Sequence, residues 1–367
     1  MENSSVLNPN NKKQFRPIEL SMNMNRGKMG FLPPEMIKYS FSFVGFNDDN
    51  LRIAISEFKL NKDESYKKYG PIEKWNVSGV KNMSKLFYEM INFNEDISLW
   101  DTSNVTDMSE MFYGCTNFNQ NLNSWNTSNV TNMSKMFEGC TNFNQNLNLW
   151  NTSNVKNMKK MFYKCLKFNQ NLNSWNVSNV INMCGMFFSS YGFNQPLDLW
   201  DVSNVRDMNS MFGKCTNFNQ NIGMWNTKNV IIMHQMFAYC VNFNQYIGEW
   251  NTEKVIDMRS MFKHCTNFNQ NIGNWNVSNV QDMSHMFDKC LSFDCDLNEW
   301  DVSKVLNMYA MFADCINFNG NVSSWNVSNV NNFGYMFHNC NSFEQYSNLW
   351  NISRNANVAG FTFHFYS

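Results

Sequence analysis

Residues 100–120 read WDTSNVTDMSEMFYGCTNFNQ, and this stretch returns with small changes through most of the 367-residue chain. All 12 tryptophans keep one constant spacing, in the series Trp75, Trp100, Trp125 and onward to Trp350. Self-similarity at a fixed period of about 25 residues is a signature of solenoid proteins, whose units cannot bury a core alone. The sequence therefore predicts one continuous stack of units rather than several globular domains.

Other positions of the repeat keep the phase of the tryptophan. A recurring valine and the third, sixth, seventh and tenth positions after it carry large apolar side chains or cysteine, and this spacing predicts one stripe of a helix. In the quoted unit they are Val105, Met108, Met111, Phe112 and Cys115. The segment from Phe118 to Leu122 has apolar residues two to four apart, which suits a short strand. The Asn or Asp after each tryptophan predicts a turn.

The predicted fold class is an α/β solenoid, leucine-rich-repeat-like, of helix–turn–strand units of about 25 residues whose strands form a parallel sheet. A polar composition predicts a disordered tail over residues 1–30. We expect a helical N-terminal cap over 31–70, because Pro33 and Pro34 can start a helix. The solenoid of about eleven units then occupies 71–350, and residues 351–367 form a C-terminal cap.

The unit W-[DN]-[TV]-S-N-V-x-x-M-x-x-M-F-x-x-C-x-x-F-N-Q-x-[LI] resembles the repeat of BspA-like leucine-rich-repeat surface proteins, a type also found in mycoplasma lipoproteins, protists and giant viruses. The resemblance covers about residues 50–352. It implies a leucine-rich-repeat-like fold and an interaction role. The N-terminus departs from surface members because it has neither a signal peptide nor a lipoprotein cysteine. The wealth of Asn, Lys, Ile and Phe is compatible with an AT-rich genome, such as that of a giant virus or protist.

A second resemblance lies near the N-terminus. Residues 32–44, LPPEMIKYSFSFV, look like the opening helix of an F-box, although Ser40 stands where an aliphatic residue is usual. An F-box docks on the Skp-type adaptor of cullin ubiquitin ligases, so residues 31–60 would bind that partner. The alternative from the residues alone is a helix that only closes the end of the core.

Composition and spacing argue against several chemistries. The charge balance of 29 Lys+Arg against 30 Asp+Glu disfavours nucleic acid as a partner. We expect no membrane span, no metal, no cofactor and no catalytic site, so the protein is predicted not to be an enzyme. Four histidines fall at different repeat positions, so no shared helix face should gather them. The cysteine column is interpreted as core, which leaves Cys184 and Cys295 as the more reactive thiols.

The predicted function is a non-enzymatic protein–protein interaction scaffold that uses the solenoid surface. The alternatives are an F-box-type substrate adaptor for a cullin ubiquitin ligase and a surface adhesin. The predicted location is cytoplasmic (the host cytoplasm for a viral protein), with a surface location left open. Partner-binding candidates are the varying residues before the tryptophans and an apolar pair elsewhere in the unit, namely Leu149, Leu199, Met224, Glu249, Ile231 and Ile232.

Overall fold

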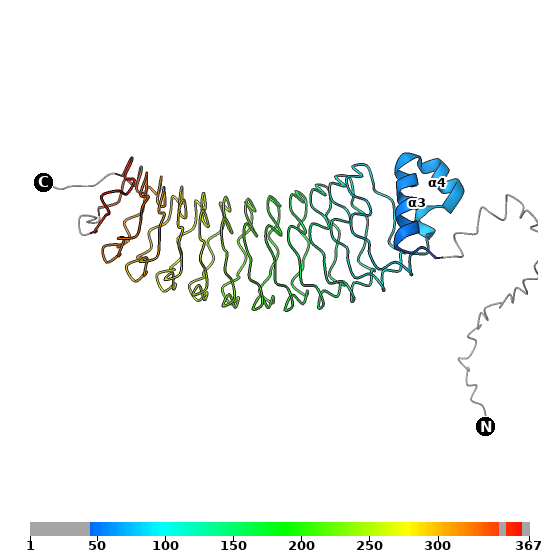
Figure 1. Ribbon diagram of the computed structural model, residues 1–367, viewed down its shortest axis with the longest axis horizontal. Coiled ribbons are helices and arrows are strands. Elements are labelled where there is room, and N and C mark those ends of the chain that lie inside the picture. Colours follow the sequence, from blue (N-terminus) through cyan, green and yellow to red (C-terminus); the bar gives the residue numbers. More distant parts are fainter. Residues whose placement is uncertain (1–44, 345–349, 362–367) are drawn as a thin grey trace, which may run out of the picture. The chain divides into compact units, whose positions relative to one another are not determined.

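The computed structural model describes residues 45–344 and 350–361. Helices occur only before the repeats in this part of the chain (Figure 1). They are α3 (Asp48–Leu60), α4 (Lys62–Tyr69) and the 3-10 helix η1 (Ile72–Lys74). These helices and the repeats belong to one compact unit. The predicted tail over 1–30 and the whole F-box-like segment, residues 32–44, lie outside the described residues.

Helix α3 covers the N-terminal edge of the first repeat unit. Arg52 donates hydrogen bonds to the backbone carbonyl oxygens of Ser84 and Asn82, at 2.7 and 3.2 Å. Asp48 accepts the backbone N–H of Lys81 at 2.7 Å. An open edge of main-chain groups invites pairing with other chains, and a helix laid over it prevents this. The cap therefore makes hydrogen bonds to the first unit in places where later units are bonded by the unit before them.

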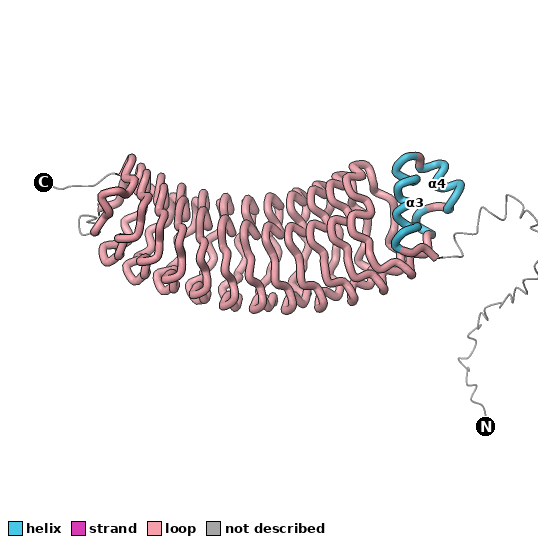
Figure 2. The backbone as a smooth tube through the Cα atoms, viewed as in Figure 1, coloured by secondary structure: helices cyan, strands magenta, loops and turns pink. Residues whose placement is uncertain are grey.

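From Trp75 onward the chain is a series of turns, and each unit lies beside the next in chain order (Figure 2). Isolated parallel β-bridges join the units at one equivalent position. There are eleven, from Asn82–Asp107 to Asn332–Asn357. The predicted repeat solenoid is confirmed, because the bridges join equivalent residues of adjacent units in one constant register.

The predicted helix of each unit is wrong. The residues five and nine positions after the valine have positive φ, as in Lys160 (54°) and Lys164 (57°), and this holds in every described unit. A left-handed residue interrupts the right-handed α-helix, and two in one turn prevent it. The N–H groups instead close four-residue β-turns, as the N–H of Met161 does by donating to the carbonyl oxygen of Met158 at 3.1 Å. The apolar side chains nevertheless face inward, so the burial pattern resembled that of a helix.

The predicted strand from Phe118 to Leu122 is also wrong, and the parallel sheet is not confirmed because the described residues form bridges but no strand. Asparagine side chains take the place of a main-chain ladder here. The Oδ1 atom of Asn94 accepts the backbone N–H of Asn119, and the Oδ1 atom of Asn119 accepts that of Asn144, both at 2.9 Å. A side chain that binds the backbone of the next unit competes with strand pairing.

The core is the set of columns that the sequence predicted. Val155, Met158, Phe162, Phe168 and their equivalents are fully buried in the middle of the stack. Their rings stack along the solenoid, with Phe137 and Phe162 5.7 Å apart between centroids and nearly parallel. Each stacked pair adds about 0.5–1.5 kcal/mol to the stabilisation that comes from burying the apolar area of the rings.

Two kinds of polar group in the core, the indole N–H of tryptophan and the thiol of cysteine, have the same hydrogen-bond partners from unit to unit. Each tryptophan from Trp100 to Trp350 donates its indole N–H to a carbonyl oxygen 28 residues earlier. The nine cysteines of the column donate to carbonyl oxygens at the same separation of 28 residues. Ser190 replaces cysteine in one unit and makes the equivalent bond to Phe162 at 2.7 Å. The interpretation of this cysteine column as core is therefore confirmed.

Candidate functional site

One surface of the stack carries most of the main-chain hydrogen bonds between units. The N–H of Lys85 donates to the carbonyl oxygen of Ser109, and the N–H of Glu89 to that of Tyr113, at 2.9 and 2.7 Å. Phe87, between them, donates its N–H to the next unit in the same way. Donors two residues apart along one chain have the spacing of paired parallel strands, although turns interrupt the strand here. Side chains four, five, eight and nine residues after each valine lie around these donors and contact one another. We call these four positions the ladder face.

The ladder face differs from unit to unit, whereas the core does not. Lysines and a tyrosine fill it in one unit, small residues and a phenylalanine in the next. These two units contribute Lys159, Lys160, Tyr163, Lys164 and then Cys184, Gly185, Phe188, Ser189. In a repeat protein, exposed positions that vary over a constant core can form a specific binding surface.

Aromatic rings and lysines alternate along the middle of the ladder face. The rings of Tyr163 and Phe188 stack with centroids 4.9 Å apart. The Lys160 and Lys164 ammonium groups lie 4.8 and 5.6 Å from the Tyr163 centroid. Lys214 lies 5.7 Å from both the Phe188 and the Tyr239 ring centroids. We call Lys160, Tyr163, Lys164, Phe188, Lys214 and Tyr239 the cation–aromatic strip.

Glu138 lies on the ladder face in the unit before Tyr163. It is half-buried, and its Oε2 atom is shielded from solvent without a hydrogen-bond partner among the described residues. Burial raises the pKa of the Glu138 carboxyl, and the nearby charges of Lys160 and Lys135 only partly oppose this. Lys135 itself pairs with Glu110 at 3.2 Å.

A buried ion-pair cluster follows farther along the ladder face. Asp288 is buried, and its Oδ2 atom lies 2.7 Å from the Lys263 ammonium and 2.9 Å from Nδ1 of His285. Burial raises the pKa of the Asp288 carboxyl, but the hydrogen bonds from His285 and Lys263 outweigh it, so the net pKa is lowered. The cluster thus holds a charged carboxylate inside the face.

A second charged group lies beside it. Arg259 pairs with Asp257 at 2.7 Å, and its guanidinium lies 3.3 Å from Nδ1 of His234. Burial lowers the pKa of His234, opposed by the charge of Asp257. The equivalent of Asp257 in the preceding unit is Ile232, which interrupts the column of Asn and Asp side chains at the bridge position.

The histidine prediction is wrong, because all four histidines of the described residues lie on the ladder face. Although they occupy different positions of the repeat, those positions share one surface. The ring of His264 stacks on Tyr239 at 4.4 Å, and that of His285 meets Tyr309 edge-on at 5.2 Å. Sequence reasoning missed this surface because it equated different repeat positions with different faces, whereas residues four, five, eight and nine after the valine share one side even of a helix.

The predicted partner-binding residues fall in two settings. The residues before the tryptophans are exposed in one column, with Leu149 at 72%, Leu199 at 72% and Met224 at 85%. Glu249 is exposed in the same column. The pair Ile231 and Ile232 is half-buried and lies away from this column. The structure therefore does not bring the six candidates together, and their role in binding stays a prediction.

The two cysteines outside the column differ in access. Cys184 is half-buried on the ladder face, whereas Cys295 is 8% exposed and its sulfur lies 3.6 Å from Oδ1 of Asn271. Burial raises the pKa of both thiols. Within the described ranges, no group of three or more His, Cys, Asp or Glu side chains could hold a metal ion. No helix in those same ranges combines the length and apolar character needed to cross a membrane.

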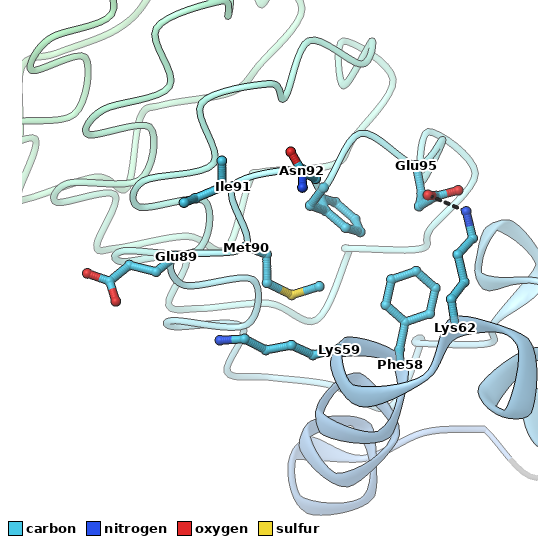
Figure 3. Close-up of a pocket in the computed structure, with 9 residues that line it drawn as sticks. Phe58, Lys59, Lys62, Glu89, Met90, Ile91, Asn92 and Glu95 are labelled. Carbon is cyan, nitrogen blue, oxygen red and sulfur yellow. Dashed lines mark hydrogen bonds and ion pairs between the residues drawn. The ribbon is translucent and has the colours of Figure 1, made fainter.

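A pocket lies where α3 meets the first unit (Figure 3). Phe58, Met90 and Ile91 form its apolar part, and Ile91 is 58% exposed. The Lys62 ammonium and the Glu95 carboxylate pair at 2.6 Å on its rim. The pocket exists because the first unit has no preceding unit, and the helical cap fills that space only in part.

Comparison with known proteins gives a family but no assigned activity. A crystal structure of a leucine rich cell surface protein from Faecalibacterium prausnitzii A2-165 is similar at 12% identity and a TM-score of 0.33, covering 77% of this chain and 86% of that one. No curated protein matches the sequence. The family described as "Mycoplasma protein of unknown function, DUF285" matches residues 56–175, 146–240, 215–308 and 268–365. This match supports the resemblance to BspA-like repeats and gives no support to an F-box. Because the matched segments run through almost the whole repeat region, the chain belongs to the DUF285 family of mycoplasma proteins of unknown function.

Proposed function

We propose that the protein is a non-enzymatic interaction module that binds a protein partner through the ladder face. One observation carries this proposal: the ladder face varies from unit to unit yet is continuous along the stack, over a core that barely changes. The face holds charged, aromatic and imidazole groups in mutual contact, from Tyr163 to Tyr335. Tyrosine, phenylalanine and arginine, all present on this face, are residue types enriched at protein interfaces.

The column before the tryptophans is the competing surface. Its exposed Leu149, Leu199 and Met224 are apolar, and isolated exposed apolar residues are common on proteins without any binding role. Serines such as Ser174 separate the leucines, so the row is not a continuous apolar patch. We therefore place the interaction on the ladder face. The F-box adaptor and the surface adhesin remain predictions without a structural observation in their favour.

The test is affinity capture with the full chain and two sets of variants. The first set replaces Lys214, Tyr239, Lys289 and Tyr335, all exposed on the ladder face, by alanine. The matched set replaces the exposed Leu149, Leu199 and Met224 by serine. Thermal unfolding confirms that each set is folded. We expect captured partners to be lost with the first set and kept with the second. The reverse result, or the same partners with every variant, would reject the ladder face as the binding surface.

A further inference from the structure

The cation–aromatic strip carries three lysine ammonium groups that form no ion pair within the described residues. Several other cations of the ladder face have carboxylate partners, as Lys263 has Asp288 at 2.7 Å and Arg259 has Asp257 at 2.7 Å. In the strip, Lys160, Lys164 and Lys214 lie over aromatic rings, and within the described residues none of them forms an ion pair with a carboxylate. The Glu138 carboxyl of the preceding unit is close enough to feel the charges of Lys160 and Lys164, but it is half-buried and not paired with them. Lys164 and Lys214 are exposed and Lys160 is half-buried, so the three ammonium groups form an accessible positive surface.

The aromatic rings of the strip hold the lysines rather than offering free faces. Tyr163 and Phe188 stack on each other at 9° between their planes, and lysine side chains lie over the same rings. Tyr239 is stacked on His264 at 15°. Single-stranded nucleic acid is bound by stacking bases on open aromatic faces, and those faces are occupied here. The accessible ammonium groups of Lys160, Lys164 and Lys214 attract carboxylates by charge. These features favour a carboxylate-rich protein segment.

We propose that the strip binds an acidic, extended segment of a protein partner, with its carboxylates on Lys160, Lys164 and Lys214. The inference rests on the proposed function, because it assigns the partner's chemistry to part of the ladder face. The strip reaches from the unit of Lys160 to that of Tyr239, three unit spacings along the stack. At about 4.8 Å per spacing this is ~15 Å, the length of about five residues of extended chain. The segment lies along the stack and crosses successive units.

The experiment measures fluorescence anisotropy of a fluorescein-labelled hexaglutamate peptide titrated with the full 367-residue chain. The test variant is the triple charge reversal Lys160→Glu, Lys164→Glu and Lys214→Glu. The matched control is Lys81→Glu, Lys156→Glu and Lys228→Glu, three exposed lysines outside the strip with the same change in net charge. We expect saturable binding that the test variant weakens by about tenfold or more, while the control changes it by less than about threefold.

Several outcomes would overturn the inference. Equal losses in both triples would mean that only net charge attracts the peptide. Tighter binding of a labelled oligothymidylate of six nucleotides at the same salt concentration, with the same loss in the test triple, would assign the strip to nucleic acid. Tighter binding to vesicles of phosphatidylserine would assign it to a lipid surface. If the peptide does not bind while partner capture still depends on the ladder face, the acidic-segment inference is rejected and the proposed function stands. If partner capture is unchanged by the ladder-face variants, the proposed function is rejected even if the peptide binds.

Discussion

The indole N–H of Trp200 donates a 2.9 Å hydrogen bond to the carbonyl oxygen of Leu172, which lies 28 residues earlier in the chain. The bond therefore links one unit to its neighbour from inside the core. The side chain is 3% exposed, and its ring stacks on that of Trp225 at 6.4 Å. One residue type thus supplies apolar burial, ring stacking and a polar link between units, which explains why every unit has it.

We expect Trp200→Ala to lower the free energy of unfolding by about 3–5 kcal/mol, since it opens a cavity and removes the inter-unit bond. Trp200→Phe keeps a ring and should cost less, with about 0.5–1.5 kcal/mol from the lost hydrogen bond. Urea unfolding followed by far-UV circular dichroism measures both. Equal stability of the alanine variant and the wild type would refute the assignment of this column to the core.

The left-handed positions give a second prediction. Gly139 has φ 78°, and a Cβ added there would meet nothing closer than 3.5 Å. Gly139→Ala should still destabilise the protein by about 1 kcal/mol, because the backbone conformation itself disfavours a side chain. The control is Gly192→Ala, where φ is not positive and the nearest atom is 3.8 Å away. This change should be neutral or stabilising. A shift of the urea midpoint by the same amount in both would contradict the reasoning.

The sequence predicted the repeat, its register and the buried columns, because side chains such as Val155, Met158 and Phe162 must leave water whatever the backbone does. It did not predict the backbone of the unit. Spacings of three and four residues are shared by a helix and by successive turns, so burial alone could not separate them. The glycines at Gly114 and Gly139 were a usable sign of left-handed positions, but lysine, serine and other non-glycine residues occupy most equivalents. The ladder face was missed for a different reason: different repeat positions do not by themselves imply different faces, and positions four, five, eight and nine share one side even of a helix.

Thiol reactivity should follow access and pKa. Burial raises the pKa of Cys115 to about 12, and it also raises the pKa of Cys184, which is only half-buried. A thiol reacts as its thiolate, so the cysteine column should be inert in the folded state. We expect iodoacetamide at pH 8 to label Cys184 first, as identified by peptide mass spectrometry. Cys184→Ser should remove this early labelling, and 8 M urea should expose the remaining thiols. Early labelling of Cys115 in native protein would contradict its burial.

The Asp288 cluster predicts loss of stability in acid. Because the hydrogen bonds from His285 and Lys263 leave its pKa below the ordinary value, ionised Asp288 stabilises the fold above the unfolded pKa of about 3.9. This contribution is lost as the pH falls through the lower, folded pKa. Asp288→Asn should cost about 1–3 kcal/mol at pH 7, since it leaves the Lys263 ammonium without its partner. The difference from wild type should shrink below about pH 4. A difference that stays constant from pH 7 to pH 3 would show that the carboxylate charge is not what stabilises.

Glu138 predicts the opposite dependence. Burial raises its pKa, so the ionised carboxylate is less favourable in the folded than in the unfolded protein. Its destabilising effect is absent below the unfolded pKa of about 4.3 and grows as the pH rises through the raised, folded pKa. Glu138→Gln removes the charge while keeping the shape, and should stabilise the protein at pH 7 by less than about 1 kcal/mol, because the side chain is only half-buried. At pH 4 the variant and the wild type should unfold at the same urea concentration. The matched change Glu89→Gln, on the exposed edge of the first unit, should have no such effect at either pH, so a gain there too would trace the result to net charge instead of to the buried Oε2 atom.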